Sequence, residues 1–130
     1  MIKDQVLEEK VFFVNRALLK QYADASGDQN PIHQDEAFAK SVGLPDVIAH
    51  GMLTMGLVAQ YVSGIAGGSS KVLEFGGRFT KPVIVPEGVD VDVTVSATVT
   101  DLVDGKASLS LSATSAGVKV LGMAKAVVAL

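Results

Sequence analysis

The octapeptide Ser-Gly-Asp-Gln-Asn-Pro-Ile-His at residues 26–33 places a carboxylate and an imidazole where they could share one water molecule. Asp28 and His33 lie five residues apart, an offset that does not join two side chains on a helix. Pro31 favours an extended Asn30, and asparagine itself favours turns. We therefore predict a fixed loop in which Asp28 accepts a proton from water and His33 donates or relays one. A loop that only caps and turns is the alternative.

His50, the second of two histidines, directly precedes a long apolar segment that starts at Gly51. A helix starting there would present unpaired N–H groups with partial positive charge. Because glycine permits close approach to the backbone, a thioester carbonyl at Gly51 would have its developing enolate oxygen stabilised. Helix–sheet packing explains Gly51 equally well. A metal site of His33, Asp35 and His50 is a further alternative, although no recognised metal-ligand spacing matches.

Composition narrows the class of protein. The chain has 130 residues, 48% of them apolar, and a mean hydropathy of +0.39. These values predict one domain, residues 1–130, with part of its apolar surface buried against another subunit. The net charge is −3 and the basic residues are scattered, so we expect no nucleic-acid partner and no membrane patch.

The cysteine content and the apolar segments indicate the cellular compartment in which the chain is expected. The absence of cysteine excludes disulfides and thiolate chemistry and is compatible with a cytoplasmic protein. Residues 1–10 lack the apolar stretch of a secretory signal, so we expect none. The apolar segment after His50 is interrupted and falls short of the roughly 20 residues that a membrane-spanning helix needs.

Three helices are predicted. Residues 16–26 form the first, with Asn15 as N-cap and Gly27 as the C-terminal stop. Its apolar positions at helical spacing are Ala17, Leu18, Tyr22 and Ala25. Asp35 can cap a short second helix over residues 36–42. Residues 51–66 are apolar all round, which predicts a third helix enclosed by other elements.

The remaining segments alternate with the period of strands. Residues 5–14 predict a first strand, and residues 71–85 a second with a bulge or bend at Gly76–Gly77. Three further strands are separated by turns at Asp104–Gly105 and Gly117; their ranges are 89–101, 106–117 and 118–130. A long apolar helix followed by such strands predicts an α+β fold whose antiparallel sheet curls around the helix.

Two stretches, "YADASGDQNPIH" at residues 22–33 and "AHGMLTMG" at residues 49–56, resemble the MaoC-like hydratase family. This family comprises (R)-specific enoyl-thioester hydratases and 3-hydroxyacyl-thioester dehydratases. The segment "RFTKPVIVPEG" at residues 78–88 resembles the family's strand after the central helix. The resemblance extends from about Tyr22 to the C-terminus. The sequence around residues 49–56 is especially similar to that of the catalytic subunit of actinobacterial acyl-carrier-protein dehydratases.

The resemblance implies a single hot dog domain, an antiparallel sheet wrapped around a long central helix. It also implies pairing through sheet edges, as a homodimer or as a heterodimer with another hot dog chain. It assigns water activation to Asp28 and His33 and the oxyanion N–H to Gly51. The supporting motif residues are Asn30, Pro31 and His50.

One position departs from the pattern. Some relatives carry a serine eight residues after the glycine of the His-Gly pair, and this chain has Ala59 there. Neither Thr54 nor Ser63 is an obvious replacement for that hydroxyl.

The activity implied is reversible hydration of trans-2-enoyl thioesters, equivalently dehydration of (3R)-3-hydroxyacyl thioesters, on coenzyme A or an acyl carrier protein. No metal or redox cofactor is implied, because the thioester already activates the alkene. Two alternatives stay open: a hot dog acyl thioesterase, and a non-catalytic acyl-binding subunit of a heterodimeric dehydratase.

Overall fold

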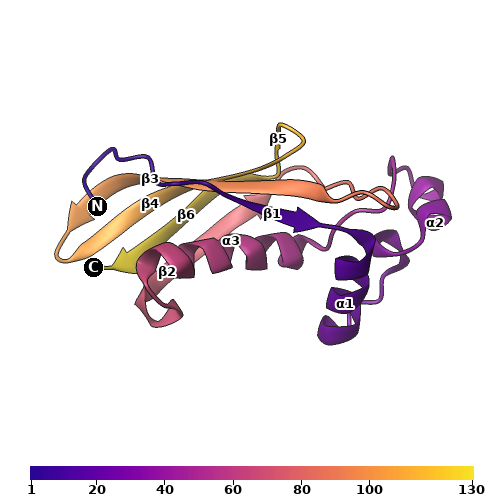
Figure 1. The fold of residues 1–130 in the computed structure, drawn as a ribbon, viewed down its shortest axis with the longest axis horizontal. Coiled ribbons are helices and arrows are strands. Elements are labelled where there is room, and N and C mark those ends of the chain that lie inside the picture. The colour runs from indigo at the N-terminus through magenta and orange to yellow at the C-terminus, as the bar shows by residue number, and fades with distance from the viewer.

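An antiparallel sheet that curves over one long helix dominates the structure, a computed structural model that describes residues 1–130 (Figure 1). The strand order is β1-β3-β4-β6-β2, and the short β5 pairs with β4 off this path. The strands are β1 (Lys10–Val14), β2 (Val72–Phe79), β3 (Val91–Val103), β4 (Lys106–Ser115), β5 (Val118–Lys119) and β6 (Leu121–Ala129). The sheet therefore has two open edges, β1 and β2.

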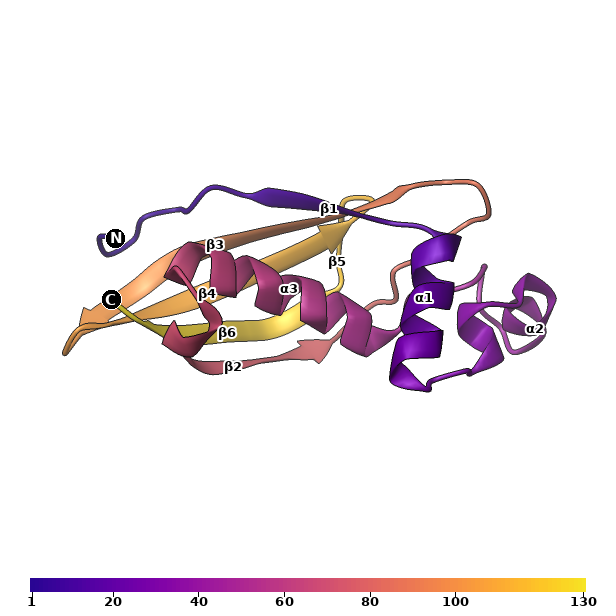
Figure 2. The ribbon, with the colours of Figure 1, turned by 60° about the horizontal axis from the view of Figure 1, so that its bottom comes forward.

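The helices divide between the face and one end of the sheet. The long helix α3 (Gly51–Ala66) lies along the sheet, with β1 to one side and β2 to the other in Figure 2. The shorter helices α1 (Arg16–Ser26) and α2 (Glu36–Ser41) stand at the end where α3 begins, and both chain termini lie at the opposite end. None of these helices combines the length and apolarity needed to span a bilayer.

Alternation along the strands explains how the sheet buries one face. In β3 the buried positions are Val93, Val95, Ala97 and Val99, and the residues between them are polar and less buried. In β4 the buried positions likewise alternate with serine and threonine. The buried face packs against α3 and forms one continuous hydrophobic core, as the period-2 pattern predicts.

The helix predictions are confirmed in their caps and in the extents of α1 and α3, whereas α2 ends one residue earlier than predicted, at Ser41. The Asn15 side chain accepts a hydrogen bond from the Leu18 N–H, and Gly27 ends α1 in the left-handed conformation. The Asp35 side chain accepts one from the Phe38 N–H at the start of α2. The predicted apolar face of α1 is displaced by one residue, however. The fully buried positions are Leu19 and Ala23, whereas Ala17 and Ala25 are exposed.

The expected enclosure of α3 is wrong for the single chain. Its buried residues are Leu53, Thr54, Val58, Tyr61 and Val62, which face the sheet. Met52 on the outer side is 61% exposed. The exposed positions of α3 are Met52, Gly56, Gln60 and Gly64, so the chain's own sheet leaves one side of the helix uncovered.

Three strand predictions are corrected. The first strand forms only over Lys10–Val14, because the pairing with β3 slips by one residue before the isolated bridge of Val6 with Thr98. The strand expected over 71–85 ends at Phe79, and the one expected over 118–130 is divided into β5 and β6. The predicted bulge is present, as a register shift between Gly76 and Arg78.

The segment beyond Phe79 leaves the sheet for a reason visible in the sequence. Pro82 has no N–H to donate to a ladder. Residues 83–85 instead pair with residues 47–49, where the Ala49 N–H donates to the Val83 carbonyl at 2.9 Å and the Val85 N–H donates to the Val47 carbonyl at 2.8 Å. This pairing fixes the segment that leads into α3 and forms a wall of the site described next.

Candidate active site

The loop that carries Asp28 is held by side-chain to backbone hydrogen bonds. The Asp28 carboxylate accepts one from the Asn30 N–H at 3.1 Å, and the Asn30 side chain accepts one from the Ile32 N–H at 3.2 Å. Asn30 thereby caps a 3₁₀ turn, Pro31–His33, with proline in its first position. The fixed loop predicted from the sequence is present, and it leaves the Asp28 side chain exposed.

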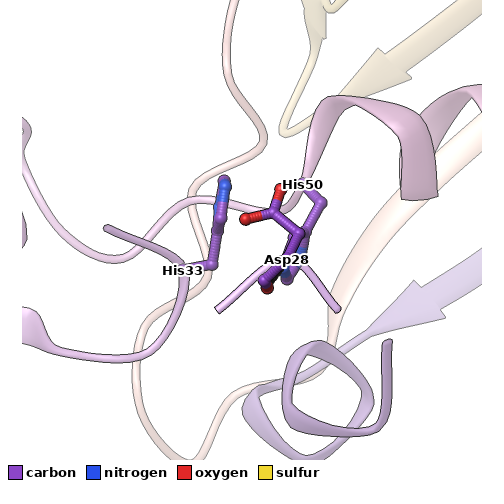
Figure 3. A group of neighbouring side chains, drawn as sticks. All are labelled: Asp28, His33 and His50. Atoms are coloured by element: carbon purple, nitrogen blue, oxygen red, sulfur yellow. Dashed lines mark hydrogen bonds between the residues drawn. The ribbon is translucent and has the colours of Figure 1, made fainter. Parts of the chain in front are cut away.

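His33 is buried beneath that loop, with 7% of its surface exposed. Its Nδ1 lies 2.8 Å from the Ile48 carbonyl oxygen. Because a carbonyl can only accept, Nδ1 carries a hydrogen, which leaves Nε2 as the ring nitrogen available for proton transfer. Figure 3 shows the Asp28 carboxylate directed to the side on which this ring lies. The predicted pair is therefore brought together, with a carboxylate oxygen and a ring nitrogen within 4.8 Å.

His50 lies against both residues and is almost fully buried, with 1% exposed. Its Nε2 donates to the Asp28 backbone carbonyl at 3.1 Å, and its ring stacks on that of His33 with centroids 3.9 Å apart. The Tyr22 ring also packs on His50 in a T-shaped arrangement, with centroids 4.7 Å apart. His50 Nδ1 has no hydrogen-bond partner, and burial lowers the pKa of the ring. The neutral ring thus connects the loop to the start of α3.

Gly51, the first residue of α3, lines a cavity of about 310 Å³ together with His33. The Gly51 N–H makes no hydrogen bond within the chain, as expected for a first-turn donor. The cavity wall includes residues of the two paired segments, 47–49 and 83–85, and of the end of β2. The other lining residues are Ile48, Ala49, Thr54, Phe79, Thr80, Lys81, Pro82, Val83 and Val120.

An aromatic ring covers Gly51. A Cβ added at Gly51 would lie 3.0 Å from Cζ of Phe79 and 3.2 Å from both of its Cε atoms. The ring tip therefore fits against the bare Cα, which only glycine permits without displacement. Phe79 is 54% exposed, so its ring can turn outward. No sequence pattern predicts this contact, because Phe79 falls inside the strand expected over residues 71–85, beyond the bulge at Gly76–Gly77.

The frame behind the site includes a partly buried ion pair. Arg16 at the start of α1 forms a salt bridge with Asp46 at 2.8 Å, and its Nε donates to the Val85 carbonyl at 2.6 Å. Asp46 also accepts from the Val47 N–H at 2.7 Å. One guanidinium thus connects α1 to both segments that form the cavity wall.

The set of residues suggested as an alternative metal site is corrected by the structure. Asp35 caps α2 and is not part of the cluster, whereas Asp28 joins His33 and His50 with ligand atoms within 4.8 Å of one another. The two rings are only 23° from parallel with centroids 3.9 Å apart, so their in-plane lone pairs lie in separate, nearly parallel planes. A zinc ion requires nitrogens that converge on one point at about 2.1 Å. The stacked rings do not fit that requirement.

The helix, the curved antiparallel sheet and the site at the helix start together define the hot dog fold. The chain belongs to the MaoC-like family, since the family described as "MaoC like domain" matches residues 1–115. The fold is shared with a solved MaoC-like dehydratase, at a TM-score of 0.96 and 35% identity over 100% of this chain and 41% of that one. An (R)-hydratase from A. caviae involved in PHA biosynthesis superimposes with a TM-score of 0.85 and 27% identity, over 100% and 97% of the two chains.

Among curated proteins, 3-hydroxyacyl-thioester dehydratase X of Mycobacterium tuberculosis is 38% identical over 76 residues. That match covers 58% of this chain and 26% of the relative. The chain thus spans about a quarter of the length of this curated relative.

Two features of the cavity were not predicted. Phe79 is one, and Thr54, which the sequence did not favour as a substitute hydroxyl, is the other. Thr54 follows Gly51 by three residues, a spacing that places both on one helix face and could have indicated it. Ala59 and Ser63 do not line the cavity.

Proposed function

We propose that this chain catalyses the reversible hydration of trans-2-enoyl thioesters to (3R)-3-hydroxyacyl thioesters. The observation that carries the proposal is the convergence of three groups at the start of α3. The Asp28 carboxylate lies beside the His33 ring, and His33 shares a cavity with the unpaired N–H of Gly51. Membership of the MaoC-like family, whose relatives include named hydratases and dehydratases, supports the same chemistry.

The proposed hydration begins with Asp28 ionised and His33 protonated. Asp28 takes a proton from water as the hydroxide adds to C3, and His33 Nε2 gives its proton to C2. Asp28 then returns its proton to His33, which restores both groups. The Ile48 carbonyl supports this role, since it accepts from Nδ1 in either protonation state and fixes the ring orientation.

The thioester oxygen gains negative charge while water adds. The Gly51 N–H, at the positive end of a helix of sixteen residues, is suited to receive that charge. Catalysis of this kind needs the donor to be in place before the reaction. The pairing of residues 47–49 with 83–85 provides that rigidity at the helix start.

We also propose that the chain works paired with a second hot dog chain, identical or different. Two features support this. β2 is an open edge of eight residues. Met52 and Phe79 near it are 61% and 54% exposed. A second copy or a related chain placed along β2 would cover both the edge and the apolar residues.

The test is an assay of enoyl thioesters from four carbons upward, on coenzyme A and on acyl carrier protein. Loss of enoyl absorbance measures hydration, free-thiol release measures hydrolysis, and the chirality of the product is determined. Hydration to the (3R) alcohol without thiol release supports the proposal. Thiol release as the main reaction would indicate a thioesterase, and no turnover on any substrate would favour a non-catalytic acyl-binding subunit.

A further inference from the structure

A buried threonine stands in the cavity beside Gly51. Thr54 is 5% exposed and belongs to the cavity wall that also includes His33 and Gly51. It lies three residues after Gly51 in α3, so the two positions share one face of the helix about a turn apart. No other hydroxyl of α3 lines this cavity.

The Thr54 hydroxyl has no partner within the chain. The side-chain hydrogen bonds of α3 and its cap are those of His50 and Tyr61, and none involves Thr54. A helical threonine often donates to the carbonyl four residues earlier. Here that carbonyl, of His50, accepts only from backbone N–H groups, at 3.1 and 3.2 Å. His50 Nδ1 is the only fully buried side-chain nitrogen or oxygen that lacks a partner, so the unpaired Thr54 hydroxyl keeps accessible surface, and the surface beside it is the cavity.

Helix geometry gives the direction of this group. Side chains of an α-helix tilt toward its N-terminus, and the Thr54 side chain therefore leans toward the end where Gly51 lies. The unpaired N–H groups of the first turn open at that same end. Two hydrogen-bond donors, one from backbone and one from a side chain, thus adjoin a single cavity.

We infer that the Thr54 hydroxyl is a second donor to the thioester oxygen of the substrate, beside the Gly51 N–H. The inference rests on the proposed hydration, because that reaction places developing charge on this oxygen. Two donors would hold the carbonyl in one orientation and share its charge as water adds. The hydroxyl, which has no partner within the chain, is free to make this hydrogen bond.

The test compares Thr54→Val, which keeps the shape and removes the hydroxyl, with Thr54→Ser, which keeps the hydroxyl. We expect Thr54→Val to lower kcat/KM for crotonyl-coenzyme A by about 10- to 100-fold. Its melting temperature should be close to that of the wild type, because valine keeps the shape and no hydrogen bond within the chain is lost. Thr54→Ser should stay within about threefold of wild-type kcat/KM, since one donor is equivalent to the other.

Two results would overturn the inference while leaving the proposed hydration intact. One is wild-type kcat/KM in Thr54→Val. The other is an equal loss in both variants together with a lower melting temperature, which indicates a packing role. If the wild type hydrates no enoyl thioester, the proposed function fails. The role of Thr54 is then tested by binding alone: a hydrogen bond to the thioester oxygen changes the infrared carbonyl frequency of bound butanoyl-coenzyme A. Equal frequencies in wild type and Thr54→Val would overturn the role.

Discussion

Replacing Gly51 with alanine separates a role in substrate binding from a role in packing. The new methyl group would lie 3.0 Å from the tip of the Phe79 ring, closer than ordinary van der Waals contact. Because Phe79 is 54% exposed, the ring can move outward to relieve the contact. Alanine is also favoured over glycine within a helix by up to about 1 kcal/mol. These opposing effects predict a change in the free energy of unfolding of less than about 1 kcal/mol.

The effect on activity should be larger. Complete loss of an oxyanion donor lowers the rate by roughly 10²-fold, or about 3 kcal/mol. Alanine keeps the N–H and crowds the space in front of it, so the thioester oxygen is held farther away. We therefore expect kcat/KM to fall by about 10- to 100-fold, with the loss shared between kcat and KM.

Steady-state kinetics beside a thermal melt tests this expectation, and the chain offers a matched control. Gly56 lies in the same helix, and a Cβ added there would meet nothing within 4 Å. Gly56→Ala should leave kcat/KM unchanged. The double variant Gly51→Ala with Phe79→Ala removes the ring that the new methyl group displaces. If the displaced ring causes the loss, activity returns in this double variant. A folded Gly51→Ala variant with wild-type kcat/KM would refute the oxyanion role of this residue.

Three further predictions concern the histidines and the assembly. His33→Ala should lower kcat by roughly 10²-fold or more without unfolding the chain, and near wild-type turnover in this folded variant would remove His33 from the mechanism. Because burial lowers the pKa of His50, the unfolded chain binds its proton more readily, so stability should fall as the pH drops below the ordinary value of about 6.5. His50→Gln, followed by denaturant titration between pH 7.5 and 5, should show a shallower dependence on pH, and an unchanged slope would contradict the assignment. The purified chain should have at least the mass of a dimer, alone or with a second hot dog chain, and a monomer by light scattering at micromolar concentration with no co-purifying chain would oppose this.

The features that were predictable from the sequence are those determined by local chemistry. Asn15 and Asp35 predict the starts of helices because their side chains accept hydrogen bonds from backbone N–H groups of the first helical turn. Asp104 and Gly105 both have positive φ, as a two-residue hairpin turn requires. The Asp28–His33 loop was predictable for the same reason, since proline and asparagine restrict the backbone between them.

The features that were not predictable depend on contacts between distant segments. Pro82 explains why the strand ends before residue 82, but nothing in residues 71–85 indicates that residues 83–85 then pair with residues 47–49. The ring of Phe79 reaches Gly51 as a consequence of that change in partner. The position of Thr54 in the wall of the same cavity likewise follows from tertiary packing.

The central claim, that Asp28 activates water for addition to an enoyl thioester, is tested most directly by Asp28→Asn. Asparagine keeps the size and the hydrogen-bonding capacity of the side chain and removes the base. The control is Asp24→Asn, which changes a nearby exposed carboxylate on α1. Hydration of crotonyl-coenzyme A should fall by roughly 10²-fold or more in Asp28→Asn and persist in Asp24→Asn, with similar melting temperatures. Near wild-type hydration by a folded Asp28→Asn variant would contradict the account.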